Sequence, residues 1–174
     1  MKTLIYLLSI LVMMIGCTEI KFTEPQPAGG EELSQFPSEI QGLFLTQDGS
    51  DSLRVDADHF EFGRVDGHLH VSATLSGDSL LFLKENLLFF NYGHNGIWSV
   101  MIVDPQNLPE LKVSMFIAED TVKLKRVSEI ASLDKQVDET GAIISYIANL
   151  SGAQFEKLMN EKLYTEVMVL SKIE

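Results

Sequence analysis

Three histidines and one glutamate have the side chains of this chain that are best suited to bind a metal or transfer a proton. His59 and Glu61 precede the dipeptide Asp66-Gly67, and His68 and His70 follow it. That dipeptide accepts the positive φ angles of a two-residue hairpin turn. Because alternate residues of a strand point the same way, the hairpin would gather all four side chains on one face. Imidazole and carboxylate groups on neighbouring strands can bind zinc or copper, so this face is a candidate metal site.

The opposite face of the same hairpin supports this register. Phe60 and Phe62 would share it with Leu69, Val71 and Ala73, which together form a coherent apolar surface. A second interpretation of the polar face stays open, because the solvent side of a sheet must be polar and histidine and glutamate meet that need without a metal.

No catalytic signature accompanies the hairpin. The sequence has no Gly-x-Ser-x-Gly elbow, no His-Glu-x-x-His pair and no phosphate-binding loop. Gly67-His68-Leu69-His70 resembles the start of a cupin metal motif, but the glutamate expected a few residues later is missing. Trp98, Phe89, Phe90 and Tyr92 could form an aromatic platform for sugars or peptides, or belong to the core. We therefore expect a protein that is not an enzyme.

The elements that must position these residues are short apolar runs separated by turn residues about every 8 to 12 positions, a spacing that predicts an antiparallel β meander. Asp66-Gly67 and Asn95-Gly96 are the clearest turns, and two prolines exclude a strand from residues 104–109. The expected strands span residues 41–46, 52–55, 59–65, 68–75, 79–84, 87–92, 97–103, 112–118 and 121–127. The fold class is therefore mostly β: a curved sheet, a small open barrel or a sandwich.

The C-terminal third adds one short helix. Ser151 and Gln154 have the spacing of a capping box, and Phe155, Leu158 and Met159 recur at helical intervals. These features predict a helix over residues 152–162, followed by a strand over 164–170. The acidic stretch 134–141 is expected to be a surface loop.

The first seventeen residues read as a secretory signal. Lys2 precedes an apolar run from Leu4 to Ile15, and Gly16 stands before Cys17, the only cysteine. The run is shorter than the roughly 20 residues that a transmembrane helix needs. With no second cysteine, Cys17 cannot form a disulfide within the chain.

Met14-Ile15-Gly16-Cys17 resembles the lipobox of bacterial lipoproteins. The resemblance implies a diacylglyceryl group on the Cys17 thiol, cleavage before Cys17 by signal peptidase II and acylation of the new amine, with palmitate as a typical chain. It also implies an outer-membrane location, because Thr18 rather than aspartate follows the cysteine. Two or three acyl chains would hold the protein on a membrane for its lifetime. An ordinary secretory signal is the alternative.

This reading divides the chain into three parts. Residues 1–16 are the signal peptide, residues 17–35 are a flexible tether rich in proline and glycine, and residues 36–174 are a single β-rich domain. The mature chain has 12 basic and 25 acidic residues, a formal charge of −13. Such a surface repels phosphate backbones, so we expect no nucleic-acid partner, and membrane attachment must come from the lipid.

Three tripeptides repeat an aspartate, a hydroxyl residue and an apolar residue. They resemble the O-glycan acceptor of envelope proteins in one Gram-negative phylum, which would place a glycan on Ser52, Ser79 and Thr121. The same residues also favour turns that lead into strands.

Two function classes follow. The preferred one is a non-enzymatic, lipid-anchored envelope protein that binds an envelope protein, a glycan or a small apolar ligand through its β domain. The alternative is a zinc-binding protein or metal-dependent hydrolase built on His59, Glu61, His68 and His70.

Overall fold

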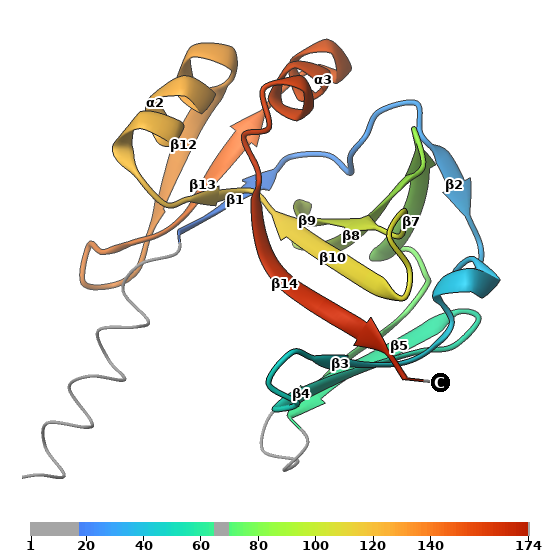
Figure 1. Ribbon diagram of the computed structural model, residues 1–174. Helices are drawn as coiled ribbons and strands as arrows, with labels where there is room; N and C mark the ends of the chain where they lie inside the picture. The colour runs from blue at the N-terminus through green and yellow to red at the C-terminus, as the bar shows by residue number, and fades with distance from the viewer. Residues whose placement is uncertain (1–17, 65–69, 174) are drawn as a thin grey trace, which may run out of the picture.

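The computed structural model describes residues 18–64 and 70–173 (Figure 1). Strands hold 54% of the residues and helices 15%, which confirms the mostly β fold class. The strands are β1 (Thr18–Phe22), β2 (Glu31–Leu33), β3 (Gly42–Thr46), β4 (Asp51–Val55), β5 (His59–Arg64), β6 (His70–Thr74), β7 (Ser79–Lys84), β8 (Leu87–His94), β9 (Ile97–Asp104), β10 (Glu110–Met115), β11 (Ile117–Ala118), β12 (Ser132–Val137), β13 (Ile143–Asn149) and β14 (Thr165–Lys172). The helices are the 3₁₀ turn η1 (Ser38–Ile40), α2 (Thr121–Ile130) and α3 (Gly152–Asn160).

One curled sheet contains these strands. Its main path runs β12-β13-β1-β9-β10-β14-β3-β4-β5-β6, while β8, β7 and β2 branch from β9, and β11 pairs with β1. The described neighbours are antiparallel except β1 and β13, which run parallel. The path curls into a half-barrel, and α2 and α3 lie beside its β12-β13-β1 end (Figure 1).

The central strands β8 and β9 are covered on both faces, because their alternate residues enter two different cores. Phe89 and Ile102 pack in the core under α2 and α3. Phe90, Met101 and Val103 belong to the core inside the half-barrel. This double burial explains why both strands read as nearly continuous apolar runs.

The predicted C-terminal helix is confirmed as α3. The Ser151 hydroxyl accepts a hydrogen bond from the Gln154 backbone N–H, and the Gln154 side chain accepts one from the Ser151 N–H, so the capping box is complete. Phe155 and Leu158 are fully buried in the core. The helix therefore exists by packing its apolar stripe on the sheet.

The strand expected to begin at Thr121 is instead helix α2, so that prediction is wrong. The Asp120 carboxylate accepts a hydrogen bond of 2.7 Å from the Lys123 N–H and caps the helix. Val127 and Ile130 are buried three residues apart, at helical spacing. An aspartate before an apolar run fits a helix start as well as a turn into a strand, which is why the sequence was misread.

The expected tether over residues 17–35 is also wrong for the part that the structure describes. Ile20 and Phe22 of β1 are fully buried. Downstream, the Gln26 backbone is held by the buried side chain of Asn91: the Gln26 N–H donates to Asn91 Oδ1 at 2.7 Å, and Asn91 Nδ2 donates to the Gln26 carbonyl at 2.6 Å. The segment has few apolar residues of its own, but distant strands satisfy its backbone. The folded domain therefore includes β1.

The acidic surface loop is shorter than expected, because residues 134–137 belong to strand β12. β12 pairs with β13 up to Val137 and Ile143, and the hairpin turn between them is closed by the Asp138 N–H donating to the Ala142 carbonyl at 2.9 Å. β12 is an edge strand of the main path, where charged side chains face solvent.

The Asn95-Gly96 turn is confirmed. Both residues have positive φ, 52° and 75°, and they join β8 to β9 as a tight hairpin turn requires. The Asp66-Gly67 turn lies outside the described residues, as do the signal peptide and Cys17.

Candidate functional site

The half-barrel encloses an apolar cavity of about 260 Å³. Strands β4, β5, β6, β8, β9, β10 and β14 supply most of its wall, and the segment around η1 completes it. Every lining residue is apolar: Phe36, Ile40, Leu53, Val55, Phe60, Phe62, Val71, Phe90, Met101, Val103, Leu111, Val113, Met115, Val167, Met168 and Leu170.

Strand register explains why one wall of the cavity is uniformly apolar. Phe62 of β5 pairs with Leu53 of β4 on one side and with Val71 of β6 on the other. Phe60 pairs with Val55 in the same way. The residues between them point outward, so the period-two alternation sends only apolar side chains inward. The predicted apolar face of the β5–β6 hairpin is thereby confirmed for its described residues.

Three phenylalanines stiffen the inner part of the cavity. The Phe60 ring meets the Phe90 ring edge to face at 5.0 Å between centroids, and Phe36 lies 6.3 Å from Phe60 and 6.5 Å from Phe90. Such ring pairs have restricted geometry, so this part of the wall is preformed.

The mouth of the cavity is marked by two exposed valines. Val71 is 50% exposed and Val167 is 41% exposed, although both line the cavity. Thr46 is the last residue of β3, and it pairs with Leu170 of β14. The residues of β14 before Leu170, including Val167, therefore extend past the end of β3, where the chain turns into β4. The cavity therefore opens at the β3–β4 turn end of the half-barrel.

The lining determines what the cavity can do. The lining side chains offer apolar contacts, with the thioethers of Met101, Met115 and Met168 as their heteroatoms, so the cavity fits an apolar ligand. An engineered apolar cavity of about 150 Å³ is large enough to bind benzene, whereas typical drug-sized ligand pockets range from about 300 to 1,000 Å³. The volume therefore fits a ligand somewhat larger than a single aromatic ring.

The predicted histidine and glutamate face is assembled only in part. His59 pairs with Thr74 and Gly63 with His70, as expected. Glu61 lies 3.4 Å from His59 Nε2 and 3.9 Å from His70 Nε2, while the other nitrogen of His59 lies 2.9 Å from the Thr74 hydroxyl.

This geometry does not support zinc binding by the histidine and glutamate face. Across residues 18–64 and 70–173, no three histidine, cysteine, aspartate or glutamate side chains converge as a ligand set. His68, the fourth member of the expected site, lies outside those residues.

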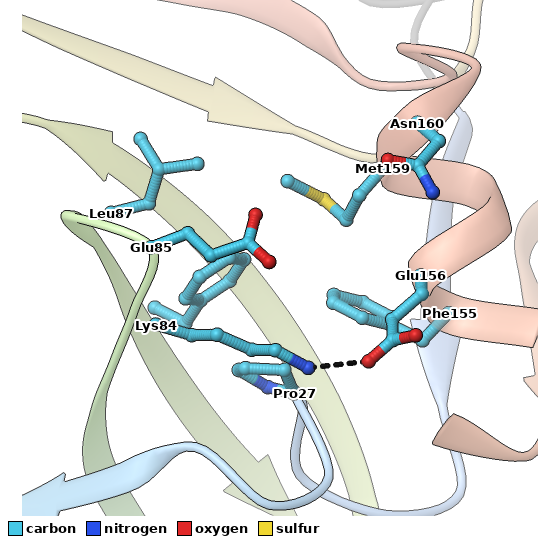
Figure 2. A pocket seen from close by; sticks show the side chains of 9 residues that line it. Pro27, Lys84, Glu85, Leu87, Phe155, Glu156, Met159 and Asn160 are labelled. Carbon is cyan, nitrogen blue, oxygen red and sulfur yellow. Dashed lines mark hydrogen bonds and ion pairs between the residues drawn. The ribbon is translucent and has the colours of Figure 1, made fainter. Parts of the chain in front are cut away.

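A second hollow lies between the β7–β8 turn and α3 (Figure 2). Its volume is about 120 Å³, and Lys84 Nζ reaches across it to Glu156 Oε1 at 2.6 Å. The dashed line in Figure 2 marks this ion pair, with Phe155 behind it. Lys84 and Glu156 pair across the hollow, and Glu85 adds a second carboxylate to the lining, so the hollow is better explained as an ion-paired seam between helix and sheet with a net negative charge.

An acidic loop between β3 and β4 is satisfied by its own donors. The Asp48 carboxylate accepts hydrogen bonds from the Ser50 N–H at 3.1 Å, the Thr46 hydroxyl at 2.7 Å and the Ser50 hydroxyl at 2.9 Å. These bonds stabilise the charged form and lower the pKa of Asp48 to about 2. The loop is a self-contained turn.

The three expected glycan acceptors differ in accessibility. Ser79 is buried at the start of β7, Ser52 is half-buried in β4, and Thr121 is exposed at the first turn of α2. In the folded domain, only Thr121 presents an exposed residue to a modifying enzyme.

The aromatic platform is not assembled. Phe89 and Phe90 are buried in different cores, and Tyr92 is exposed. Trp98 packs over Gly93, where an added Cβ would lie 2.8 Å from the indole ring. These side chains do not present a common aromatic surface.

Sequence reasoning missed the cavity lining from β10 and β14. Their alternation of apolar residues was readable, as at Leu111, Val113 and Met115. What could not be read is that β14 returns to pair with both β10 and β3, which closes the half-barrel.

Comparison of the chain with protein-family models, characterised proteins and solved structures gave no match. Within the part that the structure describes, neither helix has the length and apolar character needed to cross a bilayer.

Proposed function

We propose that this protein is a lipid-anchored, non-enzymatic protein of the bacterial cell envelope that binds a small apolar ligand in its half-barrel. The anchor is Cys17, and the outer membrane is the expected location. The observation that supports ligand binding is the cavity of about 260 Å³ with an entirely apolar lining and an exposed apolar mouth.

The hydrophobic effect supports the same proposal. An apolar ligand that enters the cavity removes its own apolar surface and that of the lining side chains from water, which contributes about 25 cal/mol for each Å² buried.

The metal-based alternative has no comparable observation behind it, because the described histidine and glutamate side chains form paired contacts rather than a ligand set. An apolar ligand is also favoured over a glycan, since a sugar needs polar groups in its site and the cavity lining provides none.

Titration with 1-naphthylamine, a neutral two-ring dye whose emission shifts to shorter wavelength in apolar surroundings, tests the proposal. We expect saturable emission with a micromolar Kd, about −8 kcal/mol of binding free energy at 1 µM. Bound dye should also raise the Tm of the protein as its concentration increases.

A matched pair of variants locates the binding. Val103→Phe replaces an isopropyl group of the cavity lining by a phenyl ring, which takes up space that the dye would occupy. It should weaken dye binding about tenfold, or roughly 1.4 kcal/mol. Val122→Phe makes the same change on the exposed surface of α2 and should leave binding unchanged. Equal affinity of the two variants, or the absence of saturable emission with the parent, would show that the cavity does not bind apolar molecules.

A further inference from the structure

The described part of the folded domain begins one residue after the predicted lipid anchor. Thr18 is already the first residue of β1, and Cys17 precedes it. A single residue spans at most about 3.6 Å, so an acylated Cys17 leaves no slack between lipid and fold. The surface around Thr18 must therefore lie at the bilayer.

That surface combines exposed apolar side chains on β12 and β13 with the exposed acidic residues Glu119 and Asp120, which follow Ala118, the strand partner of Thr18. β1 and β13 run parallel with Glu19 opposite Ser145, so Thr18 is level with Ile144. Ile144 is 56% exposed and its neighbour Ile143 is 38% exposed, while Val137, which pairs with Ile143 from β12, is 54% exposed. The register shifts between Gln136 and Val137, so Ile144 has no partner on β12, and this irregularity interrupts the alternation that would otherwise send Ile143 and Ile144 to opposite faces. The start of β1 and the β12–β13 hairpin lie on the same side of the molecule (Figure 1).

The clustering distinguishes these residues from ordinary exposed side chains. Single exposed apolar residues are normal on protein surfaces, whereas a group of them marks an interaction site. Three of the eight large exposed hydrophobic residues in the described chain lie on this hairpin. A further one, Val122, follows Ala118, the strand partner of Thr18, by four residues.

We infer that the β12–β13 hairpin rests on the bilayer through Val137, Ile143 and Ile144, and so fixes the orientation of the domain on the membrane. This inference rests on the proposed anchor at Cys17. The anchor makes the contact intramolecular, so a small apolar patch is enough to orient the domain although it would not recruit a free protein.

The charged residues of the hairpin turn determine how deeply the hairpin enters the bilayer and which lipid headgroups it favours. Asp138 and Glu139 are exposed in the hairpin turn. The Asp138 carboxylate accepts hydrogen bonds from the Thr140 hydroxyl and N–H at 2.6 and 2.8 Å, and from the Ala142 N–H at 3.0 Å, which lowers its pKa and keeps it charged. A charged turn stays at headgroup level, and it favours zwitterionic over anionic lipid.

The sole cysteine makes a direct test possible without native acylation. The mature chain starting at Cys17 is coupled through that thiol to a maleimide phospholipid in phosphatidylcholine vesicles containing brominated acyl chains, which quench tryptophan at the interface. Ile144→Trp is compared with Ile173→Trp, the same change at a residue of similar exposure (52%) at the C-terminal end of the described chain. Trp98 is common to both variants and is corrected with the parent protein.

We expect tethered Ile144→Trp to lose about half of its added emission, because the hairpin reaches the headgroup and acyl boundary, whereas Ile173→Trp should lose almost none. Replacing Val137 and Ile143 by serine in the Ile144→Trp chain should abolish the difference. Equal quenching at positions 144 and 173 overturns the inference. The inference is also overturned if the emission of Trp at position 144 falls equally in vesicles without brominated lipid and the protein elutes as a dimer. In that case the patch binds a second copy of the chain. Palmitate labelling tests the anchor separately, so failure of docking and failure of acylation are distinguishable.

Discussion

Truncation of Phe155 tests whether α3 is held to the sheet by its apolar stripe. The Phe155 side chain is fully buried, and its ring lies 5.6 Å from Phe116, 5.8 Å from Phe22 and 6.0 Å from Phe89 between centroids. Removing a buried phenylalanine costs about 3 to 5 kcal/mol, and edge-to-face ring pairs add about 0.5 to 1.5 kcal/mol each beyond their buried area. With three neighbouring rings, Phe155→Ala belongs at the upper end of that range, about 4 to 5 kcal/mol.

Urea unfolding followed by circular dichroism measures this change. A domain of this size has a urea m-value of about 2 kcal/mol/M, so a loss of 4 to 5 kcal/mol lowers the midpoint by roughly 2 M. The loss is a large part of a typical total stability of 5–15 kcal/mol, and Phe155→Leu provides a milder variant that keeps most of the apolar area. Its midpoint should lie between those of the parent and Phe155→Ala.

Val122→Ala is the control, because Val122 is 77% exposed on α2 and its truncation should change stability by no more than about 0.5 kcal/mol. If Phe155→Ala unfolds at the same urea concentration as the parent, α3 is not anchored by this ring. The core beneath the helices would then have to be held together by α2 and by strands β1, β8, β9 and β13.

Two further predictions concern the acidic loop and the anchor. Because the pKa of Asp48 is lowered in the folded protein, its contribution to stability is fully present above pH 3.8 and is lost as the pH falls toward about 2. In a ¹³C NMR titration of the Asp48 carboxyl group, Thr46→Val should move this pKa upward. An unchanged titration curve would show that the Thr46 hydroxyl does not stabilise the carboxylate. Cys17→Ser should abolish incorporation of labelled palmitate and leave the precursor uncut by signal peptidase II, whereas unchanged labelling would rule out the lipoprotein assignment.

Local patterns predicted the local elements. Strand β7 matches the expected 79–84, and α3 starts where the Ser151 and Gln154 capping box placed it. These elements are fixed by alternation, turn residues and caps within a few positions of one another. β1 was missed because its partners, β9 and β13, are far away in sequence and because a proline-rich segment follows it. Pairing over such distances leaves no local signal.

The candidate site was predictable in its parts and not as a whole. The apolar face with Phe60, Phe62 and Val71 follows from the hairpin register, and that register is confirmed on both sides of the undescribed turn. The polar face of the same hairpin attracted the metal hypothesis because histidine and glutamate are chemically conspicuous. The cavity lies on the other face, where common apolar residues become a site only after β14 has closed the half-barrel.

The two proposals are linked by the geometry between the cavity and the start of β1. Met115 lines the cavity and lies two residues from Ile117, the strand partner of Glu19. Two residues span at most about 7 Å and antiparallel partners lie about 5.5 Å apart, so the Cα atoms of Met115 and Glu19 are within about 13 Å of each other. Val167, at the mouth, lies two residues beyond Thr165, the partner of Met115. By the same steps Val167 lies within about 25 Å of Glu19, so a domain that rested on the bilayer beside Thr18 would hold its cavity mouth within that distance of the lipid interface. Apolar molecules concentrate in the bilayer rather than in water, so under the proposed anchor the shortest path into the cavity would start from the membrane.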